Sequence, residues 1–316
     1  MTTSGEFRYM DPASISAGTK PWSKVDGAYF SFTLTPHRRS VANLRDHLAP
    51  DAEPGTFGSD IDVSGFATYH FPAAEKTFSD DAAVRTGYYD EVKDLLRSKL
   101  QGSISHIEIF DHTIRRRDPT SPRQPVQQVH VDQTPAAAEA RVRRHVKLPP
   151  PELDALLQCR YQIINVWRPI GHPATDFPLA VIDWRSTKPD DLVPVDLLYP
   201  LHHRGTTSGD DDDDDDRGKE TLPDLTRAAS TEGYGVKGET YGVLPSEAHR
   251  LYYVKDMTPD EVLLLKCFDS WAEGKPQGRE GVAAWSPHTA FVDPATPEGT
   301  KGRESIEVRC LVFYDE

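Results

Sequence analysis

The sequence has few cysteines, no long apolar run and fewer basic than acidic residues. Its three cysteines, Cys159, Cys267 and Cys310, lie far apart and outside any CxxC pattern, which excludes a disulfide framework and a zinc ribbon. No run approaches the roughly 20 apolar residues of a membrane helix, and the N-terminal residues lack the apolar centre of a signal peptide. We therefore expect a cytoplasmic protein with no membrane partner.

The charge balance is acidic and unevenly distributed. Lys and Arg number 36 against 50 Asp and Glu, and the net charge of −14 argues against a nucleic-acid partner. The local basic run at 115–117 is expected to pair with acidic surface groups instead. Seven consecutive aspartates at 210–216 carry half of the net charge. They lack the alternating spacing and turn glycine of a calcium loop, so we predict a disordered acidic insertion near 205–222.

The hydrophobic pattern predicts a mainly β protein with flanking helices. Helical periodicity occurs at 88–100, 136–145 and 151–159. Alternating or apolar segments typical of strands occur at 29–35, 65–71, 104–114, 126–132, 160–170, 178–185, 248–255, 261–270, 288–293 and 305–315. Residues 1–28 are expected to form an N-terminal arm that packs on the rest of the protein. Many short strands after an initial αβ region indicate a β-sandwich or jelly-roll barrel, with no linker that would divide the chain.

His130 and Asp132 lie two residues apart in a segment that alternates like a strand. Residues two apart in a strand project to the same side, while Val129 and Val131 face the other. An imidazole nitrogen and a carboxylate oxygen can bind one metal ion. A second histidine from a distant strand would complete the two-histidine, one-carboxylate set that leaves three positions open on iron(II). The short motif alone is more often structural.

His288 fits the role of the second histidine best. It opens a strand-like segment, whereas the competing histidines adjoin the acidic run, a basic helix or an arginine. Arg303 and Ser305 follow it, two residues apart on one face of the last strand. An arginine and a hydroxyl so placed can hold the far carboxylate of a 2-oxo acid through a charge-assisted fork and one hydrogen bond.

Seven segments resemble, in the same order, those of a known enzyme family. They are 130–133 (HVDQ), 165–169 (NVWRP), 178–180 (PLA), 249–253 (HRLYY), 264–270 (LLKCFDS), 287–291 (PHTAF) and 303–309 (RESIEVR). Together they are similar to the fungal hydroxylase/desaturase family of tailoring oxygenases. This family groups with the cephalosporin 7α-methoxylase small subunit and with a meroterpenoid endoperoxide-forming oxygenase. The resemblance covers roughly residues 85–315 and is far more specific than any single motif.

The resemblance implies a dioxygenase that depends on non-haem iron(II) and 2-oxoglutarate, built on a double-stranded β-helix (a cupin-like jelly roll). It implies O₂ as co-substrate, ascorbate as reductant in vitro, and a small-molecule substrate in fungal secondary metabolism. The reaction would oxidise an unactivated C–H bond. Hydroxylation, desaturation, oxidative ring closure and endoperoxide formation all stay open, as does the identity of the substrate.

The resemblance also implies roles for individual residues. It assigns iron ligation, and with it catalysis, to His130, Asp132 and His288. It assigns 2-oxoglutarate binding to Arg303 and Ser305, with Arg309 as the rival anchor because it shares a strand face with Ser305. Gln128 is a further candidate for contact with the co-substrate or for ordering the iron ligands. The acidic insertion and the 15-residue step from His288 to Arg303 depart from the family pattern.

Four residues are candidates for binding the substrate. Asn165 could bind the co-substrate or order its surroundings, and the face of Trp167 with the guanidinium of Arg168 suits a partly apolar, carboxylate-bearing ligand. Equally, Trp167 could be core and Arg168 part of a structural pair. Lys266 interrupts an apolar strand, and if buried it needs a carboxylate partner such as bound 2-oxoglutarate or Asp269.

Two other classes of function stay open at this stage. One is a catalytically silent member of the same fold that binds a small molecule or assists a partner enzyme. The other is an iron-dependent cupin-type enzyme that does not use 2-oxoglutarate. For the organisation of the chain, we expect an N-terminal extension, residues 1–84, packed on an oxygenase core, residues 85–316, and we leave a homodimer open.

Overall fold

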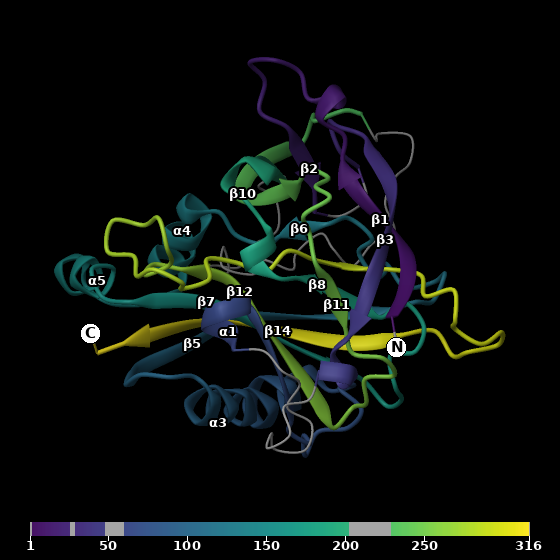
Figure 1. Ribbon diagram of the computed structural model, residues 1–316. Helices are drawn as coiled ribbons and strands as arrows, with labels where there is room; N and C mark the ends of the chain where they lie inside the picture. Colours follow the sequence, from purple (N-terminus) through teal and green to yellow (C-terminus); the bar gives the residue numbers. More distant parts are fainter. Residues whose placement is uncertain (1, 26–28, 48–59, 202–228, 316) are drawn as a thin grey trace.

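The computed structural model describes residues 2–25, 29–47, 60–201 and 229–315. Most of these residues form two β-sheets, with a few helices around them (Figure 1). The predicted class, mainly β with flanking helices, is therefore confirmed. The aspartate run at 210–216 and the insertion predicted near 205–222 lie outside the described residues. Among the helices that are described, none is long and apolar enough to cross a membrane.

The larger sheet, sheet A, has nine strands. In spatial order they are β1 (Thr2–Met10), β3 (Leu34–Asn43), β11 (Leu251–Tyr253), β8 (Leu179–Ile182), β13 (His288–Ala290), β6 (His130–Val131), β10 (Tyr234–Val243), β9 (Leu192–Pro200) and β2 (Trp22–Lys24). The pairs β11–β3 and β2–β9 are parallel, and the other pairs are antiparallel. Strands from the first 43 residues thus form both edges of sheet A.

The smaller sheet, sheet B, is entirely antiparallel. Its strands, in spatial order, are β4 (Phe66–His70), β12 (Glu261–Asp269), β7 (Tyr161–Pro169), β14 (Glu304–Tyr314) and β5 (Ile104–Arg116). Every residue of β7 and β12 is buried. Both faces of these strands are covered, which explains why their sequences are apolar runs and lack the alternation of a half-exposed strand.

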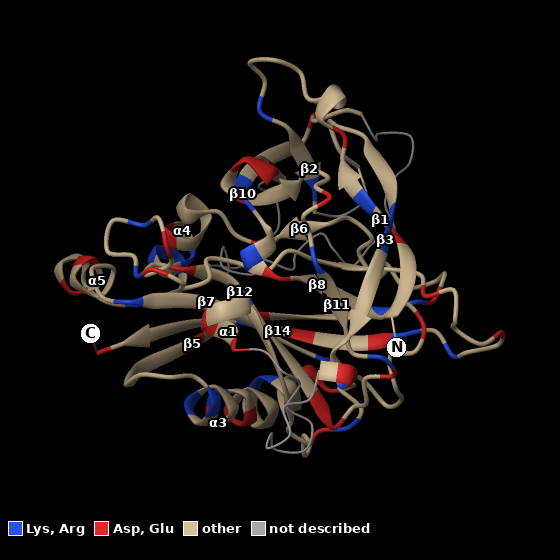
Figure 2. Ribbon diagram, viewed as in Figure 1, with Lys and Arg blue, Asp and Glu red and all other residues tan. Residues whose placement is uncertain are grey.

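Helices cover the outer face and one end of sheet B (Figure 1). The helical segments are α1 (Ile61–Ser64), α2 (Asp81–Ala83), a π-helical turn (Val84–Tyr88), α3 (Tyr89–Lys99), α4 (Pro135–His145), α5 (Pro150–Leu156) and 3₁₀ turns at Pro12–Ser14, Leu44–His47, Trp184–Ser186 and Pro189–Asp191. The apolar stripe of α3, including Val92, Leu95 and Leu96, packs on sheet B. Basic and acidic residues alternate along the rest of that helix (Figure 2).

Two sequence-based expectations for the N-terminal region were wrong. The segment expected to be an arm contains β1, which pairs with β3 along its whole length and buries Phe7 and Tyr9. The strand predicted at 29–35 begins only at Leu34 and continues through His37 to Asn43. A strand that exposes alternate residues tolerates polar side chains on its open face, so the basic segment around His37 lacks the apolar signal of a buried strand.

The inner face of sheet B is polar where it lies opposite β6 and β13 of sheet A. Residues 305, 307 and 309 alternate on β14 and face inward, while Ile306, Val308 and Cys310 face outward and pack under α3. This arrangement places charged side chains between the two sheets.

Candidate metal centre and pocket

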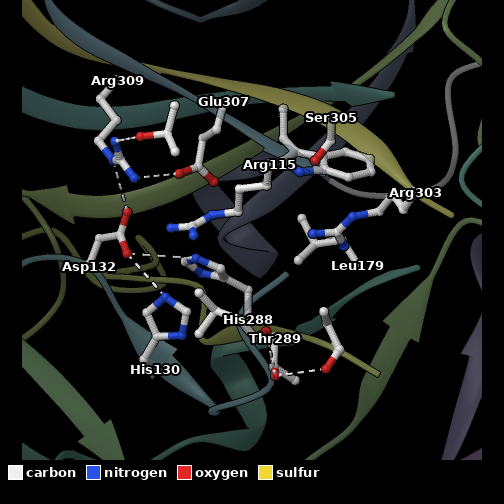
Figure 3. Close-up of a pocket in the computed structure, with 14 residues that line it drawn as sticks. Arg115, His130, Asp132, Leu179, His288, Thr289, Arg303, Ser305, Glu307 and Arg309 are labelled. Carbon is white, nitrogen blue, oxygen red and sulfur yellow. Dashed lines mark hydrogen bonds and ion pairs between the residues drawn. The ribbon is translucent and has the colours of Figure 1, made fainter. Parts of the chain in front are cut away.

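His130, Asp132 and His288 converge between the two sheets. His130 of β6 pairs in register with His288 of β13, and the two ring centroids are 4.5 Å apart. The Oδ1 atom of Asp132 lies 3.2 Å from Nε2 of His130 and 3.8 Å from Nε2 of His288. One donor atom from each residue lies within 4.8 Å of the other two. Residues separated by more than 150 positions in the sequence therefore present three potential metal ligands to one point (Figure 3).

Backbone hydrogen bonds fix the orientation of both imidazoles. Nδ1 of His130 is 2.8 Å from the carbonyl oxygen of Gln128, and Nδ1 of His288 is 3.0 Å from that of Ser286. Because a carbonyl oxygen can only accept, each Nδ1 carries the proton and each neutral ring keeps its lone pair on Nε2. The Nε2 atoms are those that face Asp132, so the protein orders both histidines as metal ligands.

The protonation states of the three groups depend on one another. Burial, together with the neighbouring His130, lowers the pKa of His288. Burial alone would do the same to His130, but its hydrogen bond to Asp132 raises the pKa of His130 above the ordinary value. Although burial opposes ionisation of Asp132, the two histidines and Arg309 hold the pKa of this carboxyl well below its usual range. The carboxylate is therefore ionised and available to a cation.

The second oxygen of Asp132 is held by two donors. Asn165 donates from Nδ2 to Oδ2 over 2.7 Å, and Arg309 donates from Nε to the same oxygen over 3.3 Å. These contacts leave Oδ1 facing the histidines. Such hydrogen bonds to a metal ligand orient it and tune its basicity.

Arg309 is engaged by further groups on sheet B. Its guanidinium donates to Asp111 and Thr113, each over 3.0 Å, and to Glu307 over 2.8 Å. Together with Asp132, three carboxylates and one hydroxyl thus share this one cation. Arg309, expected as the rival 2-oxoglutarate anchor, lines the pocket with its donors directed at protein groups.

A pocket extends from the three convergent residues along the inner face of sheet B. It encloses about 420 Å³ of space between atoms, its opening included. The residues that line it are Thr113, Arg115, Val126, His130, Asp132, Trp167, Leu179, His288, Thr289, Ala290, Arg303, Ser305, Glu307 and Arg309. They include all three candidate metal ligands and both halves of the predicted arginine and serine pair.

Arg303 is a buried cation at the end of the pocket away from the histidines (Figure 3). Its Nη1 atom donates to the carbonyl oxygen of Phe177 over 2.6 Å, and its guanidinium lies 5.5 Å from the ring centroid of Trp167. Its Nε has no hydrogen-bond partner among the described residues. Burial, followed by the nearby Arg115, lowers the pKa of Arg303 to about 9. This guanidinium has spare donor capacity in the pocket, as an anion-binding group requires.

Arg115 is a pocket residue that the sequence interpretation missed. It stands on β5 directly opposite Ser305 of β14, and its guanidinium lies between Glu307 and His288 in Figure 3. Its neighbours in the basic run are already paired, Arg116 with Glu304 and Arg117 with Asp176. The available signal was the period of two, because the predicted strand, continued past Ile114, places Arg115 and Arg116 on opposite faces.

The remaining candidates lie at different depths around the pocket. Trp167 lines it. Asn165, on the same face of β7, contacts Asp132 but does not line the pocket. Gln128 is likewise absent from the lining that the described residues form, and its carbonyl oxygen orders His130. Arg168 faces the opposite side of the sheet, where it donates to the carbonyl oxygen of Pro259 and lies 5.2 Å from the ring centroid of Tyr88.

Lys266 belongs to a separate group of buried charges, here called the Lys266 cluster and made up of Asp62, Arg160, Lys266 and Asp269. Lys266 donates to Asp269 over 2.8 Å and also pairs with Asp62. Arg160 contacts the same two carboxylates over 2.7 and 2.9 Å. The carboxylate partner that a buried Lys266 was expected to need is therefore present within the protein. No residue of this cluster lines the pocket.

Comparisons with known proteins give consistent results. A family model described as an oxidoreductase/YMDC permease-like domain matches residues 9–217 and 220–313. The Fe(II)/2-oxoglutarate-dependent dioxygenase nvfI of Aspergillus novofumigatus is 31% identical over 290 residues, which are 90% of this chain and 85% of that protein. The hydroxylase/desaturase poxK of Penicillium oxalicum is 33% identical over 244 residues, which are 77% of this chain and 69% of that protein.

A solved structure is similar over the whole chain. It is the iron and alpha-ketoglutarate-dependent endoperoxidase NvfI, with a TM-score of 0.72 and 26% sequence identity. The match covers 100% of this chain and 99% of the chain in that structure. The similarity therefore includes both sheets and the strands that carry the convergent residues.

Proposed function

This chain belongs to the fungal hydroxylase/desaturase family of Fe(II)/2-oxoglutarate-dependent oxygenases, and we propose that its pocket oxidises an unactivated C–H bond of a small natural-product intermediate. The expected family, jelly-roll fold, enzyme class and cofactors, Fe(II), 2-oxoglutarate and O₂, are confirmed. The proposal extends to the residues that bind these cofactors and to the kind of substrate.

The observation that carries the proposal is the convergence of His130, Asp132 and His288. Two imidazole nitrogens and one carboxylate oxygen are the donor set of non-haem iron(II) oxygenases, and all three donors are ordered by neighbouring groups. We assign iron ligation to these residues. When bound, iron with 2-oxoglutarate and O₂ supplies an oxidant strong enough to attack an unactivated C–H bond.

We assign the anchoring of 2-oxoglutarate to Arg303 and Ser305. Both line the pocket, and Arg303 is a buried guanidinium with an unpartnered Nε and no ion pair among the residues described. In contrast, Arg309 is held by carboxylates of the protein and positions Asp132. Buried guanidinium groups bind carboxylates strongly because the hydrogen bonds are charge-assisted and little competing water is present.

Trp167 and Leu179 supply apolar walls to the pocket, which suits a substrate with a hydrocarbon skeleton. All lining residues lie between Thr113 and Arg309, so we place the catalytic core within residues 85–316. The proposed partner is a small molecule, with neither nucleic acid nor a membrane involved, and the proposed location is the cytoplasm. The position of the substrate C–H bond decides which product forms.

The test is incubation of the protein with Fe(II), 2-oxoglutarate and ascorbate in air, together with extracts of pathway intermediates. We expect succinate to form, and a product whose mass shows gain of one oxygen atom, loss of two hydrogens or gain of two oxygen atoms. These changes identify hydroxylation, desaturation or ring closure, and peroxidation respectively. Substrate oxidation that proceeds equally well without 2-oxoglutarate would contradict the proposal.

A further inference from the structure

Arg115 adds a second cation to the pocket. Strand β5 presents Asp111, Thr113 and Arg115 on its inner face, opposite Arg309, Glu307 and Ser305 of β14. The inner faces of these two strands therefore form three cross-strand pairs, and Arg115 belongs to the pair that contains Ser305. Arg115 thus lines the pocket. The two arginines that directly follow it form ion pairs with Glu304 and Asp176 instead.

The protein provides Arg115 with little compensation for its charge. Its one hydrogen bond to a described residue runs from Nη1 to the carbonyl oxygen of Gln124, over 3.1 Å. None of the carboxylates in the described part of the chain comes within ion-pairing distance of it; Glu307, which interacts with it electrostatically, is hydrogen-bonded to Arg309. Burial lowers the pKa of Arg115, as does the nearby Arg309. A half-buried guanidinium in the pocket lining, without an ion pair, is suited to bind an anion.

The charges around the pocket balance as a set. Three cations face three carboxylates, and the six residues are Arg115, Arg303, Arg309, Asp111, Asp132 and Glu307. The complex of Fe²⁺ with doubly ionised 2-oxoglutarate is also neutral. Binding of this neutral complex therefore leaves the net charge of the pocket unchanged. A metal held by Asp132 and the two histidines would leave two guanidinium groups, those of Arg115 and Arg303, for the two carboxylates of the co-substrate.

Arg115 and Arg303 serve different ends of the pocket. The guanidinium of Arg115 lies beside His288 and interacts electrostatically with Asp132, whereas Arg303 lies beyond Leu179 with Asp176 and Glu307 as its anionic neighbours (Figure 3). A 2-oxo diacid carries one carboxylate next to its oxo group, at the metal end, and one at the distal end. Two guanidinium groups at the two ends of one pocket match this arrangement.

We propose, on the basis of the function proposed above, that Arg115 binds the carboxylate of 2-oxoglutarate that adjoins the oxo group, while Arg303 with Ser305 binds the distal carboxylate. Arg115 is then a binding residue of the iron end of the pocket. One consequence is that neither cation is available to a charged group of the substrate, so the part of the substrate next to the iron is uncharged.

The test compares two 2-oxo acids in the absence of O₂. Fe(II)-loaded protein is titrated with 2-oxoglutarate, and separately with 2-oxobutyrate, which keeps the iron-end carboxylate and the oxo group but lacks the distal carboxylate. The readout is the visible charge-transfer absorption of iron bound to a 2-oxo acid. For Arg115→Gln we expect the Kd of both acids to rise about 10- to 100-fold. For Arg303→Met we expect the Kd to rise for 2-oxoglutarate alone.

Two further variants control this test. Arg116→Gln removes the adjacent, outward-facing arginine, which pairs with Glu304, and should leave both Kd values unchanged. Arg115→Lys keeps the charge but loses the planar fork, so a smaller rise for both acids is expected. This variant provides the same comparison if the glutamine variant does not fold.

Three results would overturn the proposal, and each has a separate meaning. Wild-type affinity of Arg115→Gln for both acids would show that Arg115 contacts neither carboxylate. A rise confined to 2-oxoglutarate would place Arg115 at the distal carboxylate instead. If the wild-type protein gave no absorption band with either acid, the proposed function itself would fail, together with the role of Arg115 that depends on it.

Discussion

The Lys266 cluster and the pocket both contain buried charges, and they differ in how completely these charges are paired. In the Lys266 cluster, Lys266 and Arg160 face Asp62 and Asp269, and Gln162 donates to both carboxylates. Although burial favours the protonated acid, the two cations hold the pKa of Asp269 below its ordinary value. Each charge has its partner within the chain, as expected of a structural network.

The pocket has the opposite character. Arg303 keeps an unpartnered Nε, Arg115 has no ion pair within the part of the chain that is described, and the Nε2 atoms of two histidines converge beside one carboxylate. Each of these groups is costly to bury alone. Incomplete pairing therefore distinguishes the charges of the pocket, which a metal ion and a dianion would complete, as the functional group. Complete pairing distinguishes the Lys266 cluster as the structural group.

The largest effect is expected at the metal centre. Asp132→Ala removes the carboxylate that both Nε2 atoms face, and we expect loss of Fe(II) binding and of turnover by more than about 1000-fold. The measurement is iron content after anaerobic loading, followed by 2-oxoglutarate consumption. Asp118→Ala, at an exposed aspartate, is the matched control and should keep both. Wild-type turnover in Asp132→Ala would remove this residue from the set of iron ligands.

Breaking the Lys266 cluster should affect stability and leave cofactor binding intact. Lys266→Met leaves Asp62 and Asp269 with Arg160 as their remaining cation, and we expect a loss of about 3–5 kcal/mol in the free energy of unfolding. The melting temperature should fall by roughly 2–4 °C for each kcal/mol. Lys76→Met, in the exposed pair with Asp260, should cost less than about 1 kcal/mol.

One outcome for Lys266 would reverse the distinction between the structural Lys266 cluster and the functional pocket. A Lys266→Met protein that melts like the wild type and binds 2-oxoglutarate weakly would make Lys266 a ligand-binding residue, as the sequence alone suggested. Both properties can be measured on one preparation, by thermal unfolding and by anaerobic titration.

Asn165 tests how far the protein orders its metal ligand. Asn165→Ala removes the donor that holds Oδ2 of Asp132, so we expect a 10- to 100-fold loss of Fe(II) affinity, on the order usual for such supporting hydrogen bonds. Gln162→Ala, on the same strand but in contact with the Lys266 cluster, should reduce stability without changing iron affinity. Equal iron affinities in the Asn165 variant and the wild type would show that Asp132 needs no such support.

The smallest expected effect concerns the stability cost of Arg303. Burial and Arg115 lower its pKa to about 9, so the folded protein binds this proton less tightly than the unfolded chain does. The charge therefore destabilises the metal-free protein below about pH 9, and the cost diminishes as the pH rises above that value. We expect metal-free Arg303→Met to be more stable than the wild type by about 1–3 kcal/mol at neutral pH.

The difference in stability between Arg303→Met and the wild type should become smaller as the pH rises toward about 10, because the cost of the buried charge decreases there. Thermal unfolding of the two proteins between neutral pH and about pH 10 measures this difference in stability. Arg116→Gln is the control for the loss of an exposed arginine. If Arg303→Met is less stable than the wild type at every pH, Arg303 is a structural residue and the pocket is less distinct from the Lys266 cluster than we propose.

The sequence was sufficient where local periodicity carries the information. Alternation placed His130 and Asp132 on one side, and the helix at 88–100 followed from its apolar stripe. It was insufficient for two strands that lie next to the edges of sheet A. β3 includes His37, and β9 contains Pro194, so neither has the continuous apolar or β-branched pattern by which strands are recognised.

The errors in the candidate site have a common physical cause. Lys266 was a candidate for substrate contact because its partner Asp62 lies 204 residues away, and such a distant pair cannot be read from local pattern. Arg115 was taken as surface charge because it precedes Arg116 and Arg117. Pairing between distant strands decides which charged residues are compensated, and that pairing is a property of the folded chain.

The central claim is that the incompletely paired groups of the pocket hold one iron ion and one 2-oxoglutarate. Anaerobic titration of the wild-type protein with Fe(II), followed by 2-oxoglutarate, tests this claim most directly. We predict one equivalent of iron per chain and a charge-transfer absorption that appears only when both components are present. Absence of iron binding, or an iron complex whose spectrum does not change on addition of 2-oxoglutarate, would contradict it.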